Sequence, residues 1–154
     1  RVNRDSLGEE GEFNQLVKPV LNPKLSDFFI HLTGITQKDI DTKGVSFPDA
    51  LKQFTLWTGD DMLYSWGTGD PVVLRENCAI HDIPFPFDHE RFSSMQEFFI
   101  SMGIPAGDYN SGTITKAFGR EPSRRQHNAL NDARTILDGL RELNNHINTS
   151  FLTQ

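Results

Sequence analysis

The stretch on which the fold prediction turns is MLYSWGTGDP, residues 62–71. Its first half, residues 62–66, is a short and mostly apolar run, bounded by Asp60-Asp61 on one side and Gly67 on the other. Such a run predicts a β-strand that is covered on both faces, and therefore a central strand of a sheet. Asp70-Pro71 then predicts the start of a helix. Val72, Val73, Leu74 and Cys78 are expected to supply the buried side of that helix.

Outward from this stretch, predicted strands and helices alternate. Residues 12–17 follow a glycine-bounded turn and predict a strand, whereas residues 25–32 have apolar side chains at helical spacing and stop at Thr33-Gly34. Ser46-Phe47-Pro48-Asp49 is typical of a capped helix start. Further helices are expected at residues 94–102 and 113–118, with a loop at residues 82–88. The last helix has one apolar stripe: Ala129, Ala133, Ile136, Leu137, Leu140 and Leu143.

These elements predict an α/β fold in one continuous domain. The length of 154 residues suits a single globular domain, and no internal repeat or linker-like segment divides it. The formal net charge of −6 argues against a broad phosphate-binding surface, so any contact with nucleic acid is expected to be local. No apolar run is long enough to span a membrane, and no secretory signal is recognisable. The single cysteine, Cys78, excludes an internal disulfide framework and fits a cytoplasmic location.

Three polar residues next to predicted elements are candidates for chemistry: Asp70, His127 and Asp132. Asp70 follows the apolar strand, and the alternative to a catalytic role is that it caps the next helix. Asp132 lies roughly 80° from the centre of the apolar stripe, at a border from which a carboxylate can reach a cleft. Its alternative role is a favourable interaction with the helix dipole. We expect both carboxylates and the imidazole to converge on one pocket.

His127 lies in a polar and basic approach to the last helix, so burial does not explain it. A histidine can remove a proton from water, provided that something else activates the water. Asp70 and Asp132 could do so by holding Mg²⁺, which takes oxygen ligands and keeps several waters. The alternative for His127 is a solvated side chain without function.

Taken together, SWGTGD at residues 65–70 and HNALNDAR at residues 127–134 resemble the second and third motifs of the DEDD-type 3′-to-5′ exonucleases with a histidine base. These are the DnaQ and RNase T relatives, which have a ribonuclease H-like fold with a mixed sheet flanked by helices. The segments LVKP at residues 16–19, LSD at residues 25–27 and LTGITQKDI at residues 32–40 are also similar to that family, in order and spacing. The resemblance implies that Asp70 and Asp132 are metal ligands and that His127 is the general base. It also implies two divalent metal ions about 4 Å apart.

One motif of that family, an Asp-x-Glu on the opening strand, is absent from residues 1–154. The nearest matches, Glu10-Gly11-Glu12 and Asp39-Ile40-Asp41, lie in polar or turn-like surroundings. Four carboxylates would balance two divalent cations, whereas Asp70 and Asp132 leave two positive charges uncompensated. We therefore expect residues 1–154 to be a single exonuclease-like domain that is incomplete at its N-terminus and lacks its first strand, and to be catalytically impaired as printed.

Basic and aromatic residues near the candidate site predict contacts with substrate. Lys116, Arg120, Arg124 and Arg125 gather in the sequence near His127, and such a rim suits the phosphates of a single strand; the alternative is a solvated loop. Trp66 is a further candidate substrate contact, with core packing as its alternative. Phe85 and Phe87 lie in the predicted loop, where they could stack on bases or pack in the core.

The resemblance therefore implies a Mg²⁺- or Mn²⁺-dependent exonuclease that hydrolyses single-stranded nucleic acid from its 3′ end. RNA is favoured over DNA because the closest likeness is to the branch of RNA-trimming and sporulation-pathway exonucleases. One rival is a non-catalytic module of the same fold that binds nucleic acid or protein. Another is a metal-free structural domain.

Overall fold

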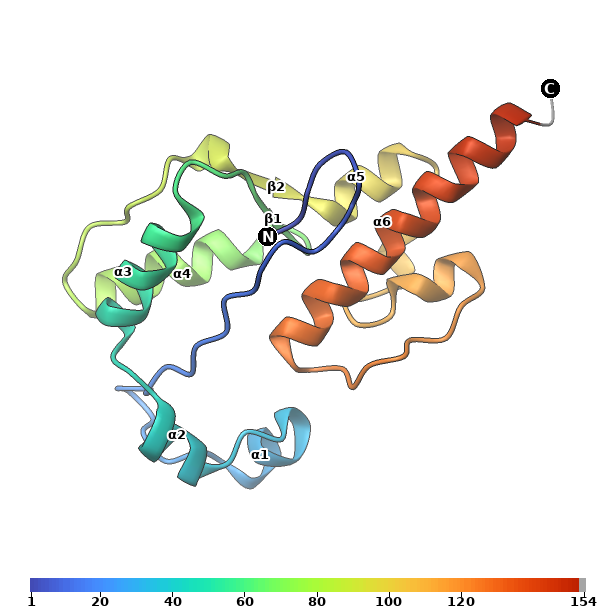
Figure 1. Ribbon diagram of the computed structural model, residues 1–154. Helices are drawn as coiled ribbons and strands as arrows, with labels where there is room; N and C mark the ends of the chain where they lie inside the picture. Colours follow the sequence, from blue (N-terminus) through green and yellow to red (C-terminus); the bar gives the residue numbers. More distant parts are fainter. Residues whose placement is uncertain (153–154) are drawn as a thin grey trace. The chain divides into compact units, whose positions relative to one another are not determined.

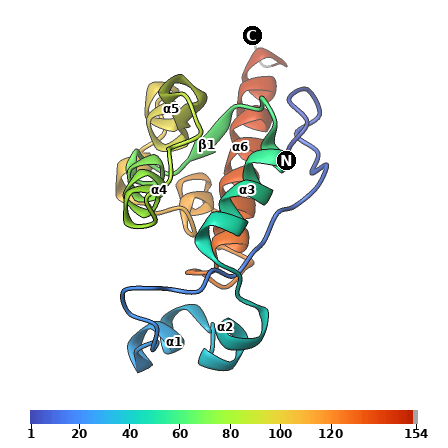
Figure 2. The same ribbon diagram turned by 90° about the vertical axis from the view of Figure 1, so that its left-hand side faces the viewer.

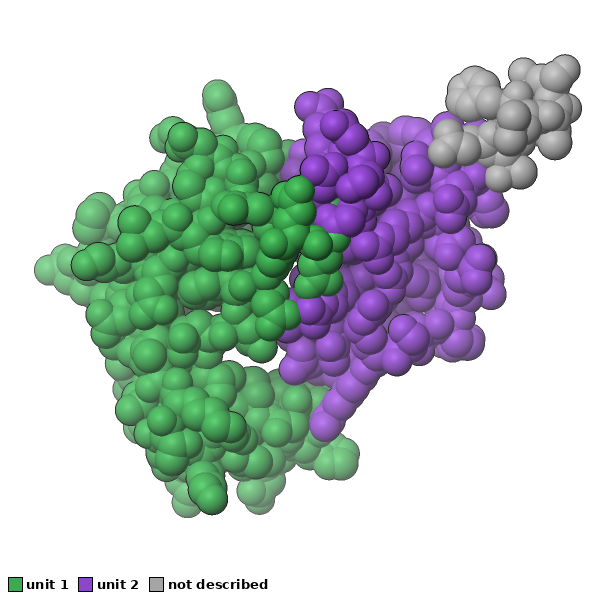
Figure 3. Space-filling model, in the orientation of Figure 1, with its two compact units in different colours: residues 1–2, 9–63, 68–93 green, residues 3–8, 64–67, 94–154 purple. Residues whose placement is uncertain are grey.

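The computed structural model describes the backbone of residues 1–152 and the side chains of residues 1–147. Its contacts divide the chain into two compact units (Figure 3). Unit 1 comprises residues 1–2, 9–63 and 68–93, and unit 2 comprises residues 3–8, 64–67 and 94–154. Each unit is described by itself below.

Unit 1 contains four helices whose ends carry strong local signals. They are α1 (Asp27–Thr33), α2 (Gln37–Lys43), α3 (Phe47–Thr58) and α4 (Gly69–Ile80). The hydroxyl of Ser46 accepts a hydrogen bond from the amide of Asp49, with a proline in the first turn, as the sequence predicts. Gly34 ends α1 with φ +77°, a left-handed conformation that favours glycine. Helices α1 and α2 lie side by side in both ribbon views (Figures 1 and 2).

Helix α2 is an element that the sequence reading missed, although its start signal is present. Thr36 and Asp39 form a reciprocal capping box, in which each side chain accepts a hydrogen bond from the other residue's backbone amide. The helix is only seven residues long, and Ile40 is its single buried side chain. The apolar periodicity is too short to indicate a helix.

The core of unit 1 is aromatic. Phe47, Leu51, Cys78 and Phe87 are buried together, with Phe54, Phe85 and Phe92 among the partly buried residues around them. The ring of Phe87 packs edge-on against the rings of Phe85 and Phe92, with centroids 5.7 Å apart in each case. Of the two roles considered for Phe85 and Phe87, the structure therefore favours core packing.

The described residues contain two strands, β1 (Leu63–Ser65) and β2 (Phe92–Ser94), which pair in a two-stranded sheet. The strand predicted at residues 12–17 is wrong, because this segment forms one isolated parallel bridge, Val17 with Val45, and is otherwise irregular. The central position predicted for β1 is also wrong, since Tyr64 is 62% exposed. The strand β2 was not predicted. It follows a short 3-10 helix, η1 (His89–Arg91).

Helix α4 begins close to where it is predicted, and Cys78 is buried as expected. Two of its predicted buried side chains are misassigned, because Val72 and Val73 are 54% and 55% exposed. Among residues 1–152, none of the helices combines the length and the apolar character needed to cross a membrane.

Unit 2 is built around the long helix α6 (Ala129–Leu152). Helix α5 (Met95–Ser101) and two 3-10 helices, η2 (Ala106–Asp108) and η3 (Ile114–Phe118), complete it. Phe99 and Ile114 are fully buried, and Leu143 of α6 packs with them. Gly139 permits a close approach, because a β-carbon there would lie 3.1 Å from Ile114 and 3.3 Å from Phe99. This packing fixes α6 against η3, and the segment between them carries His127.

Candidate active site

His127 and Asp132 lie together at the start of α6 in unit 2. Asn128 closes the first turn, since its Oδ1 accepts from the amide of Asn131 at 3.1 Å and its carbonyl accepts from the amide of Asp132 at 2.9 Å. The backbone amide of His127 hydrogen-bonds to the Asp132 carboxylate. The start of the helix therefore brings the backbone of His127 and the carboxylate of Asp132 into direct contact.

The backbone of His127 adopts an unusual conformation. Its φ is +61°, in the left-handed region that non-glycine residues seldom occupy. The residue is exposed, so packing of its side chain does not hold it there. Such conformations cost roughly 1–3 kcal/mol and persist where surrounding contacts enforce them. The strain coincides with the residue that the sequence singles out as a general base.

The carboxylate of Asp132 is only partly satisfied. Its Oδ1 is buried and has no hydrogen-bond partner among the described residues. Burial raises the pKa of this carboxyl, and the nearby side chain and amide of His127 oppose that rise. Gly112 lies directly against the same oxygen, because a β-carbon on Gly112 would be 2.8 Å from it. An uncompensated carboxylate oxygen of this kind suits a ligand that brings positive charge.

Asp70 belongs to unit 1, where it is the second residue of α4. The N-cap of this helix is Thr68, and no side chain makes a capping hydrogen bond. The alternative that Asp70 caps the helix is therefore wrong. The residue as a whole is exposed, yet partial desolvation of the carboxyl raises its pKa.

The donors fit a hard divalent cation to a limited extent. Among residues 1–147, no group of three or more His, Cys, Asp or Glu side chains lies together as a metal cluster. Mg²⁺, however, is commonly held by one or two carboxylates, with waters and substrate phosphates completing the set. The unpaired, buried oxygen of Asp132 fits one such ligand position.

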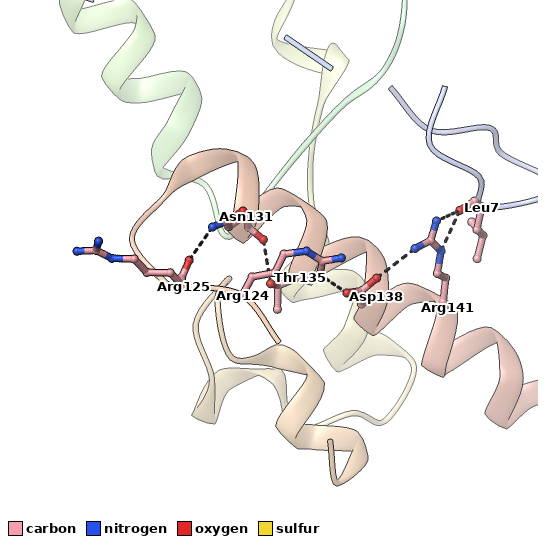
Figure 4. A network of polar contacts seen from close by, with 7 residues as sticks. All are labelled: Leu7, Arg124, Arg125, Asn131, Thr135, Asp138 and Arg141. Carbon is pink, nitrogen blue, oxygen red and sulfur yellow. Dashed lines mark hydrogen bonds and ion pairs between the residues drawn. The ribbon is translucent and has the colours of Figure 1, made fainter. Parts of the chain in front are cut away.

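The basic residues near His127 are mostly engaged in ion pairs. Lys116 pairs with Glu121 at 3.2 Å, and Arg120 pairs with Glu142 at 2.6 Å. Arg124 pairs with Asp138 (Figure 4). A phosphate would compete with these carboxylates for the three cations, so they form a weaker phosphate-binding rim than their number suggests. Arg125 is exposed, and its carbonyl accepts from the side chain of Asn131 at 3.1 Å.

Trp66, the aromatic candidate for substrate contact, is partly buried in unit 2. Its ring lies 6.2 Å from the ring of Phe99, between centroids, at the edge of the unit's core cluster. Packing is thus part of its role, and its partial exposure leaves room for a second one.

The structure adds three residues that sequence reasoning missed: Gly112, Asn128 and Asp138. Asn128 is a favourable capping residue next to a predicted helix, so its signal is readable in the sequence. Gly112 matters because backbone from another segment approaches Asp132, and no local pattern reveals this. Asp138 pairs with a residue 14 positions away, which likewise leaves no local signature.

Comparison with known proteins places these features in a family. The family described as Exonuclease (RNase_T) matches residues 1–140. The probable 3′-5′ exonuclease KapD of Bacillus subtilis is 30% identical over 128 residues, covering 80% of this chain and 60% of that protein. Human 3′-5′ exoribonuclease 1 is 28% identical over 145 residues, covering 88% of this chain and 41% of that protein. The chain thus spans less than two thirds of the length of these curated relatives.

A solved structure agrees with this placement. The nuclease domain of 3′hExo, a DEDDh family member bound to rAMP, superposes with a TM-score of 0.80 at 26% identity, covering 94% of this chain and 77% of that one. The predicted ribonuclease H-like α/β fold is therefore confirmed. Membership in such a family also implies dependence on a divalent metal ion. From the match over residues 1–140, we conclude that the chain belongs to the exonuclease family.

Proposed function

We propose that this protein is a metal-dependent 3′-to-5′ exonuclease that shortens single-stranded nucleic acid, with RNA preferred over DNA and with Mg²⁺ or Mn²⁺ as the metal ion. The observation that carries the proposal is the contact between His127 and Asp132, in which the backbone amide of the exposed His127 hydrogen-bonds to a carboxylate that has an unpaired, buried oxygen. The preference for RNA rests on relatives whose names describe exoribonucleases and on one relative bound to rAMP.

In this proposal His127 takes the proton from the attacking water. A positioned general base contributes roughly 10²- to 10⁴-fold in rate, and histidine can act as one near neutral pH. Asp132 and Asp70 are proposed as metal ligands, because partial desolvation makes each carboxylate costly to leave without a positive partner. A divalent cation would lower the pKa of a bound water and stabilise charge on the phosphate oxygens.

Substrate contacts are proposed for Arg125, Trp66 and Arg124. Arg125 is exposed beside His127, where its guanidinium can reach a phosphate. Trp66 can offer the uncovered part of its indole to a base. Arg124 has a competing partner in Asp138, so a substrate phosphate would have to displace this carboxylate.

The rival proposal is a binding module of the same fold that does not cut. It is favoured by the absence, among residues 1–147, of a metal cluster of three or more ligands. The two proposals differ in what happens to the 3′ end of a bound strand.

An oligonucleotide assay separates them. A single-stranded RNA labelled at its 5′ end is incubated with Mn²⁺ and with the complete protein, including the Asp-x-Glu motif that residues 1–154 lack, and the products are resolved by length. The exonuclease proposal predicts a ladder that shortens from the 3′ end. It also predicts loss of the ladder in His127→Ala and its retention in His89→Ala, an exposed histidine of unit 1. Retention of the strand without shortening contradicts the exonuclease proposal and supports the binding module.

A further inference from the structure

The segment between η3 and α6, residues 119–128, has no regular secondary structure and carries His127. A loop without backbone ladders is held by whatever side-chain contacts reach it. Because His127 keeps a strained φ of +61°, these contacts must be strong enough to prevent relaxation. The question is which side chains supply this restraint.

Polar side-chain contacts span the space between this loop and α6. A cavity of about 260 Å³ lies there, with Pro122 and Ser123 of the loop and Thr135 of α6 in its lining. The Oγ1 atom of Thr115, which also lines the cavity, is buried without a hydrogen-bond partner among the described residues. Atoms that line a cavity make few dispersion contacts across it, so van der Waals packing holds the loop to the helix only weakly at this point.

Asp138 bridges the hollow and is the centre of a network in Figure 4. One carboxylate oxygen accepts from Nη1 of Arg124, three residues before His127. The other oxygen accepts from Nη1 of Arg141 at 3.1 Å. Arg141 in turn donates from Nε and Nη2 to the carbonyl of Leu7, at 3.0 and 2.7 Å. Asp138, which contacts the loop through Arg124, is therefore itself fixed by Arg141, and both of its carboxylate oxygens accept hydrogen bonds.

The pair formed by Arg124 and Asp138 is better shielded than the others on this loop. Its side chains are 31% and 28% exposed, whereas Arg120 in the pair with Glu142 is 66% exposed. Solvent and salt screen a shielded pair less than an exposed one. A second tie lies close by, since the side chain of Asn131 donates to the carbonyl of Arg125 at 3.1 Å. Restraint is thus concentrated on the residues directly before His127.

We propose that Arg124 and Asp138 form a clamp that fixes the loop before α6 and so positions the imidazole of His127. Both are positioning residues that act through His127. The catalytic consequence rests on the proposed function, in which His127 is the general base, while the mechanical role of the clamp does not. Loss of the clamp should let the loop open and let φ of His127 relax.

Hydrogen–deuterium exchange on the full chain tests the mechanical role. Asp138→Asn keeps the shape of the side chain but removes its charge, and should speed exchange in residues 120–128 by roughly three- to tenfold. Exchange in residues 95–101 of α5 should stay unchanged. Asp138→Glu should restore slow exchange, because it keeps the charge. Glu121→Gln is the matched control, since it removes an ion pair with Lys116 that does not reach α6.

Steady-state kinetics on single-stranded RNA test the catalytic role. Asp138→Asn should lower kcat by about tenfold or more, because a misplaced base impairs the reaction, and should not raise KM, because Arg124 released from Asp138 stays available to the substrate. Asp138→Glu should recover most of kcat. A merely structural role would lower the amount of active protein and leave kcat per active molecule unchanged.

Two results would overturn the clamp. One is unchanged exchange in residues 120–128 of Asp138→Asn. The other is an equal rise in exchange throughout unit 2, which would make Asp138 a general stabilising residue. Absence of nuclease activity in the complete wild-type protein would contradict the proposed function instead, and the exchange data would still decide whether the pair holds the loop.

Discussion

Asp39 and Asp132 are both acids in the first turn of a helix, yet their surroundings are opposite. Asp39 in α2 accepts from the amide and hydroxyl of Thr36, at 3.2 and 2.5 Å, and from Nζ of Lys43 at 2.7 Å. These hydrogen bonds lower the pKa of Asp39 to about 2. Asp132 in α6 keeps a buried oxygen without a partner among the described residues, and burial raises its pKa. One acid is satisfied by its own helix end, and the other is not.

The difference teaches how to separate a structural acid from a functional one. An acid that completes a capping box stabilises its helix, and its carboxylate needs no further hydrogen-bond partner or ligand. An acid left partly desolvated and incompletely bonded costs stability, and such a cost is typical of sites that await a ligand. Position in the helix alone does not distinguish the two, so the variants below compare them directly.

The largest expected difference is in catalysis. Asp132→Asn should lower the rate of 3′ shortening by about 100-fold or more, because it removes a proposed metal ligand. Asp39→Asn should leave the rate within about twofold of wild type, since Asp39 serves only its capping box and its pair with Lys43. The measurement is the rate of product formation from a 5′-labelled RNA in Mn²⁺. Equal losses in both variants would remove the distinction between the two acids.

The surroundings of Asp132 can also be changed by a substitution at Gly112, which lies against its carboxylate. Gly112→Ala should destabilise the protein by roughly 1–3 kcal/mol, because its β-carbon would lie 2.8 Å from Asp132 Oδ1 and from Gln126 Cγ. Gly107→Ala is the matched control, since a β-carbon there meets nothing within 4 Å. Chemical denaturation followed by circular dichroism measures both variants. If Gly112→Ala proves as stable as Gly107→Ala, Asp132 is not confined as the structure shows.

The two acids should affect stability with opposite signs. At pH 7 and without divalent ions, Asp132→Asn should raise the free energy of unfolding by less than about 1 kcal/mol, because it removes a partly buried charge. Asp39→Asn should lower it, because the capping box and the ion pair lose their charged member. Thermal unfolding of both variants beside wild type checks the signs. A destabilised Asp132→Asn would indicate that its carboxylate is satisfied after all.

The smallest effect is the dependence of these differences on pH. The pKa of Asp39 is about 2 in the folded chain and 3.8 ordinarily, so its stabilisation is complete above pH 4 and is lost as the pH falls towards 2. The pKa of Asp132 is raised above 3.8, so the folded state binds the proton more tightly, and stability declines as the pH rises through the raised value.

Melting temperatures of wild type and the two asparagine variants between pH 2 and pH 7 would show this. The deficit of Asp39→Asn should disappear at the acid end of the series. The advantage of Asp132→Asn should be greatest at neutral pH and should vanish once the wild-type carboxyl is protonated. Parallel curves for all three proteins would contradict both assignments.

The sequence predicts helices better than strands in this chain. Ser46 with Pro48 marks α3 locally, and the apolar stripe that includes Leu137 and Leu143 marks α6, so both helices are confirmed. The exposure of Tyr64 depends on which strands lie beside β1, and no local pattern carries that information. The division into two compact units is likewise a property of long-range contacts, and the single-domain prediction remains a prediction.

The sequence predicted the reactive residues of the candidate site. It did not predict the contacts that position them. His127 and Asp132 stand out by type and spacing, and the structure brings them into contact. The left-handed φ of His127 and the pairing of Arg124 with Asp138 come from tertiary contacts over many residues. The sequence therefore assigned Arg124 to a phosphate-binding rim, whereas the structure shows it in an ion pair with a helix acid.

Calorimetric titration of the full chain with Mn²⁺ tests most directly whether the unsatisfied carboxylate of Asp132 awaits a cation. The account predicts measurable binding to wild type, undiminished binding to Asp39→Asn, and binding to Asp132→Asn that is weakened by at least about tenfold, as loss of a charged oxygen ligand requires. Equal affinity of wild type and Asp132→Asn for Mn²⁺ would contradict it.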